Sequence, residues 1–404
     1  MALIVQKYGG TSVANIEKIR NVAERVAEEY DKGNDLIVVL SAMAGVTNSM
    51  TKLAKQITAT PESRELDVLL STGEQTTIAL LAMTLISTGY PAISMLGHQA
   101  DIRTNDTFGK ARILAIHADR IKKFIKKKKI VVVAGFQGWN ANGDITTLGR
   151  GGSDTSAVAI AAALKADVCE IFTDVNGIYT ADPNICLKAQ KLNEISYDEM
   201  LEMSSLGAKI LQIRSVEFAK KYNVPVHVRS SFCKEEGTMV VAEHSNMESL
   251  VVSGITCNKN EARITLKKVP DQPGTAVKLF TPISRAGILV DMIIQNTRSG
   301  GQTDMTFTVP QSDFAKAVEI SRKVAEEVGA EEILTAENIA KISVTGVGMK
   351  SHSGVAAKMF ATLAAENINI RLISTSEIRI SCVIEAKYAE LAVQVLHTAF
   401  ELDS

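Results

Sequence analysis

The stretch Thr146-Thr-Leu-Gly-Arg-Gly-Gly-Ser-Asp-Thr-Ser-Ala157 decides the fold class. It follows an apolar run at 130–136 that predicts a buried strand, and it precedes an apolar run at 157–164 that predicts a packed helix. Its three glycines would let the backbone approach a ligand closely, and Ser153, Asp154 and Thr155 are candidate N-caps of a helix end that attracts anions. Arg150 adds a planar fork suited to a carboxylate or a phosphate. These twelve residues alone also fit an ordinary flexible turn with a capped helix.

Two segments near the start of the chain repeat this pattern. Leu3–Tyr8 predicts a strand that leads into Gly9 and Gly10, and Asp35–Leu40 predicts a strand that leads into the turn 41–47. Strands that alternate with helices indicate a mainly parallel sheet covered on both faces, and such sheets bind ligands beyond the carboxyl ends of their strands. We therefore expect the three turns to gather at one edge of the sheet.

Two further segments complete the polar turns. Residues 71–75 are expected to precede an apolar helix at 77–85. A short strand at 169–174 leads into the loop 174–183, whose Asn-Gly and Asp-Pro pairs indicate a structured loop.

The second part of the chain contains an internal repeat. Residues 274–293 align with 354–373 at a constant offset of 80, with six identities in twenty positions. Such a match indicates a duplicated structural unit. Each copy predicts a strand, a helix, two strands and a closing helix, and the polar segment 242–248 would link the repeat to the first part.

Composition excludes several classes of protein. The 404 residues carry 44 basic and 45 acidic side chains, so no overall field recruits nucleic acid or an anionic membrane. The five cysteines are scattered, which argues against a disulfide framework or a zinc site, and no metal-ligand spacing is found. We see no signal peptide and no run of transmembrane length. A reducing cytoplasm fits best.

The combination of motifs is specific to one family. The motifs are Lys7-Tyr-Gly-Gly-Thr-Ser-Val13, Val39-Leu-Ser-Ala-Met-Ala-Gly-Val-Thr-Asn48, Gly73-Glu74, Leu148-Gly-Arg-Gly-Gly-Ser-Asp154 and Phe172-Thr-Asp-Val-Asn-Gly-Ile-Tyr-Thr-Ala-Asp-Pro183. Followed by two modules that look like ACT domains, they make the whole chain resemble bacterial aspartate kinase. The resemblance implies an α/β class protein with the three-layer, carbamate-kinase-like fold of amino-acid kinases, built on a mainly parallel sheet. Two βαββαβ ACT modules would follow it.

This resemblance also implies domains and an activity. A catalytic domain would span 1–245, and ACT modules would span 246–335 and 336–404. The enzyme would use ATP with Mg2+ to convert L-aspartate to 4-phospho-L-aspartate, the first step toward lysine, threonine and methionine. Because the attacking carboxylate is ionised at neutral pH, no general base is needed, and catalysis rests on alignment and charge neutralisation.

The resemblance assigns roles to residues of the catalytic domain. Lys7 would neutralise the phosphates, and Asp154 would orient Lys7 or a magnesium-bound phosphate. The residues expected to bind aspartate are Ser41, Thr47, Glu74, Arg150, Gly151, Gly152 and Ser153, with Arg150 on the α-carboxylate and Glu74 on the ammonium group. Those expected to bind ATP are Lys7, Gly9, Gly10, Thr173, Asp174, Tyr179, Asp182 and Lys209. Some of these residues could instead have purely structural roles, since Ser and Thr at strand-helix junctions are often only helix caps and Tyr179 could be a core aromatic.

An effector site is expected in the repeat. A glycine and small residues at a helix N-terminus suit an amino-acid carboxylate, while Asp291 and Gln295 on the following strand could meet its ammonium end. By the resemblance, the effector is lysine, threonine or both. The expected residues are Asp271, Gly274, Thr275, Ala276, Asp291 and Gln295 from the first copy, and Asn369, Ile370, Thr375 and Ser376 from the second.

Assembly and two other functions remain open from the sequence. The ACT modules suggest a homo-oligomer, and Met247 stands where some relatives begin a separate, short ACT-only subunit. An amino-acid kinase with another acceptor, such as glutamate, would share the ATP loop. A catalytically silent amino-acid sensor would not need Lys7, Asp154 and the nucleotide loop, which argues against it.

Overall fold

A computed structural model describes residues 1–205, 210–243, 251–298, 301–350 and 352–403. The chain forms two compact units, each described here by itself. The first contains residues 1–179 and 191–247, and the second contains residues 180–190 and 248–404. The segment 180–190, which the sequence placed in the first domain, therefore packs with the second unit. There the hydroxyl of Thr180 lies 2.8 Å from Nε2 of His397.

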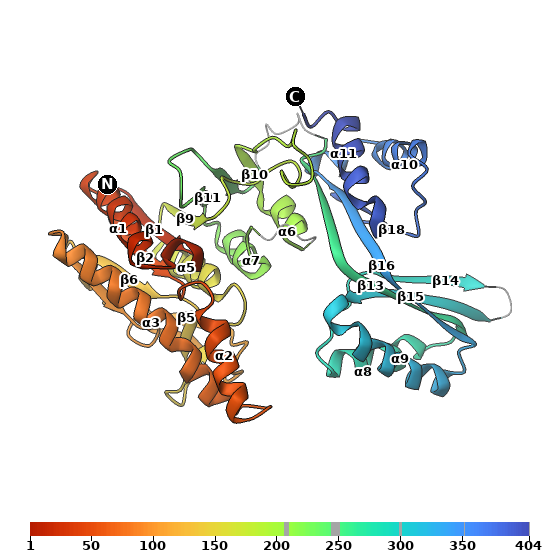
Figure 1. Ribbon diagram of the computed structural model, residues 1–404, viewed down its shortest axis with the longest axis horizontal. Coiled ribbons are helices and arrows are strands. Elements are labelled where there is room, and N and C mark those ends of the chain that lie inside the picture. Colours follow the sequence, from red (N-terminus) through yellow and green to blue (C-terminus); the bar gives the residue numbers. More distant parts are fainter. Residues whose placement is uncertain (206–209, 244–250, 299–300, 351, 404) are drawn as a thin grey trace. The chain divides into compact units, whose positions relative to one another are not determined.

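The first unit is built on an eight-stranded sheet with the order β10-β12-β11-β9-β1-β2-β6-β3 (Figure 1). Its strands are β1 Leu3–Tyr8, β2 Asp35–Leu40, β3 Ala92–Met95, β6 Ile130–Ala134, β9 Val168–Thr173, β10 Glu194–Ser196, β11 Val226–Ser230 and β12 Thr238–Val241. Every neighbouring pair is parallel except β11 and β12. The predicted, mainly parallel sheet is confirmed.

Helices cover both faces of this sheet. They are α1 Ile16–Asp31, α3 Ser63–Ser87, α4 Asp119–Ile125, α5 Gly152–Leu164, α6 Tyr197–Ser205 and α7 Ile213–Tyr222, while α2 Val46–Ile57 packs on α3. Side chains alternate along β1, so that Ile4 and Tyr8 pack with α1 and α3, whereas Val5 packs with α4 to α7. The result is the expected three-layer fold.

The helix α3 differs from the prediction. It begins at Ser63 rather than near Thr77, so 71–75 form part of the helix and Glu74 lies in its interior. By length and composition, α3 is also apolar enough to cross a membrane, which corrects the expectation that no run reaches that length. Half of the apolar window is buried within the unit, so its hydrophobicity is explained by packing on the sheet.

A small second sheet stands before the glycine-rich loop. It contains β4 Ile102–Thr104, β5 Ile113–Ile116, β7 Gln137–Trp139 and β8 Ile145–Thr147 in the order β5-β4-β7-β8. Strands β7 and β8 form a hairpin. The loop at 148–151 follows β8, whereas the sequence predicted that it would follow the buried strand β6. Alternation of strands and helices did not reveal the hairpin, because β7 and β8 have only three residues each.

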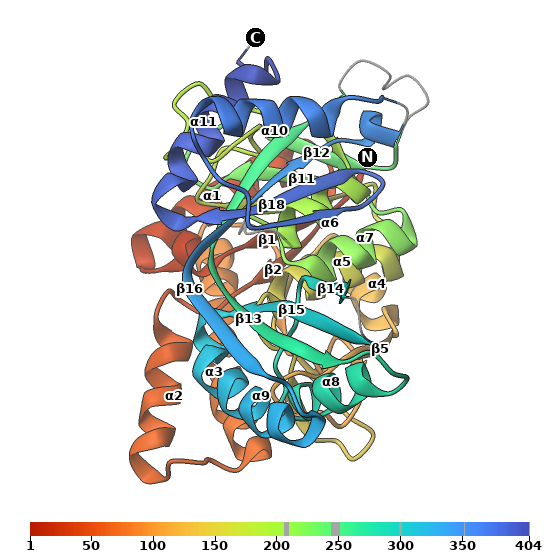
Figure 2. The ribbon, with the colours of Figure 1, turned by 90° about the vertical axis from the view of Figure 1, so that its right-hand side faces the viewer.

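The second unit contains one antiparallel sheet with the order β14-β15-β13-β16-β18-β17 (Figure 2). Its elements are β13 Gly254–Pro270, α8 Thr275–Arg285, β14 Ile293–Arg298, β15 Gln302–Pro310, α9 Phe314–Val328, β16 Glu332–Thr345, α10 Val355–Ala365, β17 Leu372–Thr375, β18 Arg379–Glu385 and α11 Ala389–Ala399. The internal repeat is visible in α8 and α10, which have 11 residues each and begin after glycines with φ of 96° and 99°.

Both long strands of this sheet take part in both modules. The start of β13 pairs with the end of β16, and its later part pairs with the start of β16. Helices α8 and α9 cover one hydrophobic core, and α10 and α11 cover another. The boundary expected between residues 335 and 336 falls inside β16.

Candidate active and effector sites

The carboxyl ends of neighbouring strands bring the predicted turns together. Backbone hydrogen bonds link each turn to the strand beside it, from Gly9 N to Phe172 O, from Ser41 N to Tyr8 O and from Gly135 N to Leu40 O. Because β9, β1, β2 and β6 are adjacent and parallel, the segments after them lie at one edge of the sheet. The predicted convergence is found for the turns after β1 and β2.

Lys7 and Asp154 form a buried ion pair at this edge. Lys7 Nζ lies 2.5 Å from Asp154 Oδ1, and the two side chains are 11% and 10% exposed. Lys7 is the penultimate residue of β1, and Asp154 lies in the first turn of α5, where the helix end favours a negative charge. The lysine thus presents a fixed positive charge beside the glycine turn.

The turn after β1 depends on a close backbone approach. A Cβ on Gly10 would lie 2.7 Å from the carbonyl oxygen of Ala42, and a Cβ on Gly9 would lie 3.5 Å from Lys7 Nζ. The amide of Ala44 donates to the carbonyl of Gly10 at 3.1 Å. A Cβ on Gly10 would clash with the backbone of Ala42, whereas one on Gly9 would only touch Lys7, so Gly10 is needed for the close packing of this turn against the turn after β2.

Glu74 reaches the same edge from the interior of α3. Its Oε1 accepts a hydrogen bond from the amide of Ala42 at 2.9 Å, and the adjacent Gly73 allows the close contact of α3 with Ala42. Within the described ranges, Oε2 of Glu74 is buried without a hydrogen-bond partner. Burial raises the pKa of Glu74 to about 7, against the hydrogen bond from Ala42, which lowers it. An incoming cationic group would satisfy this oxygen.

The glycine-rich loop places the other predicted acceptor residues. Gly149 and Gly151 have φ of 77° and 70°, and Gly151 is the N-cap of α5. The expectation that Ser153, Asp154 or Thr155 caps the helix is therefore wrong, since all three lie in its first turn. Gly152 starts the helix, Ser153 is buried, and Arg150 is exposed at the head of the loop.

Ser41 and Thr47 flank the turn between β2 and α2. Ser41 follows β2 directly, and its carbonyl accepts a hydrogen bond from the Thr77 hydroxyl at 2.9 Å. Thr47 lies in the first turn of α2. Both residues are half-buried.

The structure brings together only part of the predicted nucleotide residues. Thr173 ends β9, and its hydroxyl donates to the exposed carboxylate of Asp174 at 3.1 Å. Tyr179 is half-buried and forms a β-bridge with Lys191. Asp182 belongs to the second unit, where its carboxylate accepts from the backbone and side-chain amides of Asn184. Lys209 lies outside the described residues.

Most of the predicted effector residues of the first repeat lie at the start of α8. Gln295 Nε2 lies 3.5 Å from Asp271 Oδ1, and the Thr275 hydroxyl donates to Pro270 O at 3.0 Å. Gly274 is the N-cap of α8. Asp291 was expected to lie on the strand after α8, but it precedes this strand, β14. Its carboxylate is paired with Lys341.

The predicted residues of the second repeat lie around β17. Asn369 and Ile370 precede this strand, Thr375 ends it, and Ser376 follows. Although β14 and β17 stand at opposite ends of the strand order, Met292 and Leu372 belong to one small hydrophobic cluster. The two repeats therefore meet beside the strands that carry the predicted residues.

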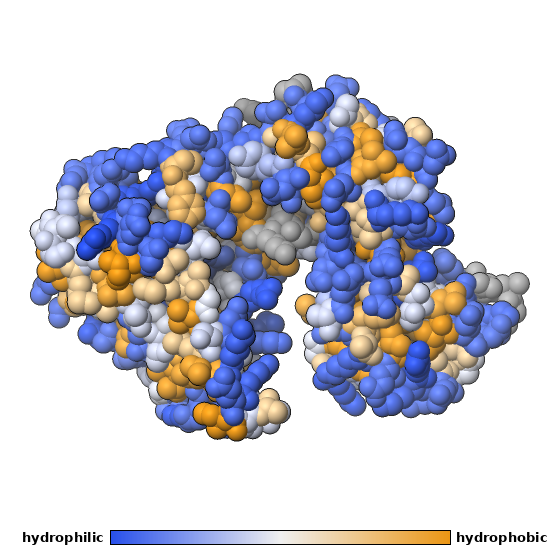
Figure 3. All heavy atoms as spheres, viewed as in Figure 1, coloured by the Kyte–Doolittle hydropathy of each residue, from blue (hydrophilic) through white to orange (hydrophobic). Residues whose placement is uncertain are grey.

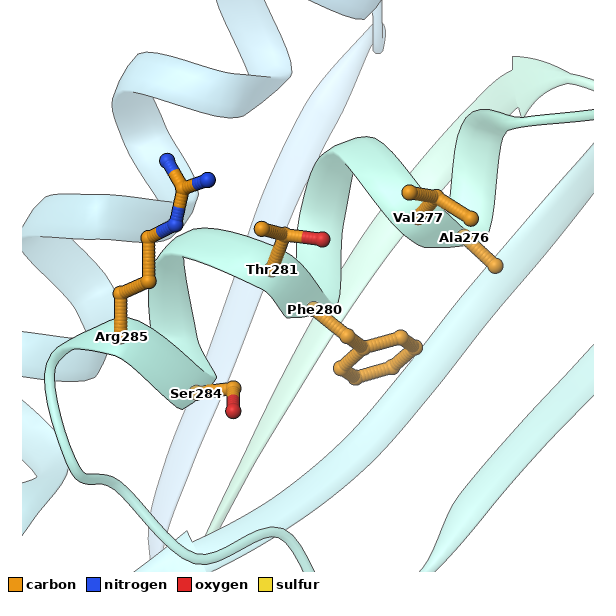
Figure 4. Close-up of a pocket in the computed structure, with 6 residues that line it drawn as sticks. All are labelled: Ala276, Val277, Phe280, Thr281, Ser284 and Arg285. Atoms are coloured by element: carbon orange, nitrogen blue, oxygen red, sulfur yellow. The ribbon is translucent and has the colours of Figure 1, made fainter.

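A hollow of about 460 Å³ lies on α8 and is lined by Ala276, Val277, Phe280, Thr281, Ser284 and Arg285 (Figure 4). Figure 3 shows hydrophobic residues among hydrophilic ones on the face that carries α8 and α9. Ala276 is the one predicted effector residue among those that line the hollow.

Among the charged residues that the sequence analysis missed are the buried Asp67 and Lys341 and the half-buried Arg214. Asp67 lies in α3, Arg214 in α7 and Lys341 in β16, and each makes polar contacts with residues far away in the chain. A single charge in an otherwise apolar run is the only signal that could have found Asp67 and Lys341.

Comparison with known proteins identifies the family. The model of the amino acid kinase family matches residues 2–230, and that of the ACT domain matches 267–323 and 342–400. The chain is 57% identical to an aspartate kinase of Stutzerimonas stutzeri and 55% identical to an aspartokinase of Pseudomonas aeruginosa, covering 100% of this chain and 98% of each relative.

Solved structures show the same architecture. Aspartokinase III of E. coli in complex with aspartate and ADP is 27% identical, with a TM-score of 0.81 over 98% of this chain and 99% of that one. The same enzyme in complex with lysine and aspartate is 26% identical, with a TM-score of 0.79 and the same coverage. With full-length relatives above half identity and both family models matched, the chain belongs to the aspartate kinase family and combines an amino-acid kinase fold with two ACT modules.

Proposed function

We propose that the first unit transfers the γ-phosphoryl group of ATP to the side-chain carboxylate of L-aspartate and so forms 4-phospho-L-aspartate. The buried pair of Lys7 and Asp154 at the meeting point of the strand ends carries this proposal. A fixed cation beside glycine amides is what a phosphoryl group needs as its charge spreads over its oxygens. The complex of an E. coli relative with aspartate and ADP supports the choice of substrates.

Each residue at the edge has a distinct part in this reaction. Lys7 neutralises the phosphate oxygens, and Asp154 holds the ammonium group of Lys7 in place. Gly9 and Gly10, which lack side chains, would let the backbone of this turn approach the phosphates closely. Thr173, Asp174 and Tyr179 form the wall that contacts the nucleoside. By the family resemblance, Asp182 and Lys209 would also contact ATP.

The acceptor is recognised as a zwitterion. Arg150 pairs with its α-carboxylate, while the unpartnered Oε2 of Glu74 receives its ammonium group. Ser41, Thr47 and Ser153 supply hydroxyl contacts, and Gly151 and Gly152 let the backbone approach. The side-chain carboxylate of aspartate then attacks phosphorus directly, and no residue has to remove a proton.

Magnesium would arrive with ATP. In the described ranges, no three His, Cys, Asp or Glu side chains are grouped to hold a metal ion. The ion would be bound mainly by phosphates and water, with Asp154 as the nearby carboxylate. The ion would offset charge on the phosphates, while the chain itself positions Lys7 and the acceptor.

The ACT modules would carry feedback inhibition by lysine, threonine or both. Asp271, Gly274, Thr275, Ala276, Asp291 and Gln295 would form one wall of the effector site, and Asn369, Ile370, Thr375 and Ser376 the other. The complex of an E. coli relative with lysine supports an amino-acid effector. We further propose a homo-oligomer in the cytoplasm, accompanied by a short ACT-only subunit that begins at Met247, a residue outside the described ranges.

One assay tests the activity and its regulation. ATP consumption is measured with aspartate or glutamate as acceptor, and then with lysine and threonine added singly and together. We expect turnover with aspartate and inhibition by at least one effector. Turnover with glutamate but not with aspartate would show that glutamate is the acceptor. No turnover with either amino acid would favour a catalytically silent amino-acid sensor. Native mass spectrometry would show whether a short chain accompanies the full one.

A further inference from the structure

Asp67 is a buried carboxylate that binds the backbone beneath the glycine-rich loop. It lies in α3 and is 1% exposed. Its Oδ2 accepts from the amides of Thr147 at 2.7 Å and Gly109 at 2.9 Å, and its Oδ1 accepts from the Thr147 hydroxyl at 2.7 Å. All these donors belong to segments of the small sheet, so the carboxylate ties that sheet to α3.

Arg214 binds a carbonyl group of the same segment, one residue further along the chain. It lies in α7, and its two terminal nitrogens donate to the carbonyls of Leu148 at 2.6 Å and Ala111 at 3.0 Å. Arg214 is half-buried, and this burial lowers the pKa of its guanidinium. The side chain of Gln212, the N-cap of α7, fills the space at Gly151, where a Cβ would lie 1.7 Å from Gln212 Cγ.

The two charges act on complementary parts of the same backbone. Asp67 accepts from the N–H of residue 147, and Arg214 donates to the C=O of residue 148, two positions before Arg150. Hydrogen bonds to charged groups are stronger than those between neutral ones, so the backbone is held at two peptide groups, 146–147 and 148–149, just before the glycine-rich loop. Without such anchors, a loop with glycines at 149, 151 and 152 would sample many conformations.

We propose that Asp67 and Arg214 are positioning residues that hold the loop 148–153 in the conformation in which Arg150 and Ser153 meet the acceptor amino acid. This rests on the proposed role of Arg150. Neither residue is proposed to touch the substrate. Asp67 and Arg214 anchor the loop 148–153 and not the turn at Gly9. Their loss should therefore raise the KM for aspartate more than the KM for ATP.

The test uses variants of the full-length chain. Asp67→Ala and Arg214→Gln should each raise the KM for aspartate by about tenfold or more, from the loss of charged hydrogen bonds, and change the KM for ATP by less than about twofold. Asp67→Asn should have a KM for aspartate close to that of the wild type. The amide oxygen of the asparagine can still accept from both backbone amides, and its NH2 group can donate to the Thr147 hydroxyl. Trypsin should cleave after Arg150 faster in the damaged variants, as followed by mass spectrometry.

A matched control separates positioning from general stability. Glu199 is also buried and accepts from the amide and hydroxyl of Ser196 at the start of α6. Glu199→Ala should lower the melting temperature but leave the KM for aspartate and the cleavage after Arg150 unchanged. If Asp67→Ala does not fold, the KM for aspartate is measured in Arg214→Gln and in Thr147→Val. The second variant removes the hydroxyl that donates to Asp67.

The outcomes are distinct. A KM for aspartate within about twofold of the wild type in both Asp67→Ala and Arg214→Gln, with lowered stability only, would overturn the proposal; so would an equal rise in the KM for ATP. If Arg150→Ala leaves the KM for aspartate unchanged while Arg214→Gln raises it, the role of Arg150 is wrong but the positioning of the loop is upheld.

Discussion

Lys7 Nζ on β1 lies 2.5 Å from Asp154 Oδ1 on α5, and both side chains are nearly buried. A strand and a helix nearly 150 residues apart in the chain thus meet through opposite charges at the edge where the turns converge. In this setting, removing one partner leaves the other charge buried without compensation.

Lys7→Met should therefore damage both catalysis and stability. We expect kcat to fall by about 10²- to 10³-fold, as for the loss of one group that stabilises developing charge. Stability should fall by about 3 kcal/mol, because Asp154 is left unpaired. ATP turnover and urea unfolding measure the two effects. As a control, Lys220→Met breaks an exposed pair with Asp198 and should change stability by less than about 1 kcal/mol.

Glu74 should make the ligand-free protein less stable as the pH rises. Burial raises its pKa from 4.5 to about 7, so the folded state binds the proton more tightly than the unfolded chain. Stability is therefore unaffected by this group below pH 4.5 and declines between pH 4.5 and pH 7, by up to about 3 kcal/mol. Urea unfolding at pH 5 and pH 8 should show this decline in the wild type and a smaller one in Glu74→Gln. Identical pH dependence in both proteins would contradict the assignment.

Binding of the acceptor should depend on the same proton in the opposite sense. Below about pH 7 Glu74 is increasingly protonated and loses its attraction for an ammonium group. The Kd for aspartate, measured by calorimetry, should therefore increase as the pH falls from 8 to 6. Glu74→Gln should bind aspartate weakly at both pH values. A wild-type Kd that does not change over this range would remove Glu74 from the ammonium site.

The sequence predicted the local elements better than their contacts. Strands β1 and β2 were predicted to the residue, because each is a short apolar run that ends at a glycine or serine turn. Helix α3 was predicted too short, since Asp67 and Glu74 interrupt its apolar pattern although both are buried. Charges of this kind are explained only by distant partners.

The same limit applied to the candidate sites. Motifs identified Lys7, Glu74 and Asp154, which the fold brings to one edge. Asp67 was missed because its partner Thr147 lies 80 residues away, on a hairpin whose strands are too short to show a period. The packing of 180–190 with the second unit was missed for a similar reason, since its contacts with His397 and Gln394 span more than 200 residues.

Lys341 should be important for the stability of the second unit. Its side chain is 2% exposed and lies 2.7 Å from Oε1 of Glu261, which is 5% exposed, and it also pairs with Asp291. Burial raises the pKa of Glu261, and the charge of Lys341 opposes this. Lys341→Met should cost about 3–5 kcal/mol at neutral pH, because Glu261 loses its compensating charge. The double variant Lys341→Met/Glu261→Leu should recover much of this in urea unfolding, and no recovery would show that packing, not charge, sets the cost.

Asp271→Ala and Gln295→Ala should weaken feedback inhibition and leave uninhibited turnover intact. The two side chains face each other at 3.5 Å beside the N-terminus of α8, so each can contact an amino acid whose carboxylate meets that helix end. The loss of one hydrogen bond to a charged group should raise the half-inhibitory concentration of lysine or threonine by about tenfold. Glu319→Ala removes an exposed carboxylate from α9 and should leave inhibition unchanged. Equal loss of turnover and inhibition in the Asp271 and Gln295 variants would mean that these residues support the fold, because an effector contact acts only when the effector is bound.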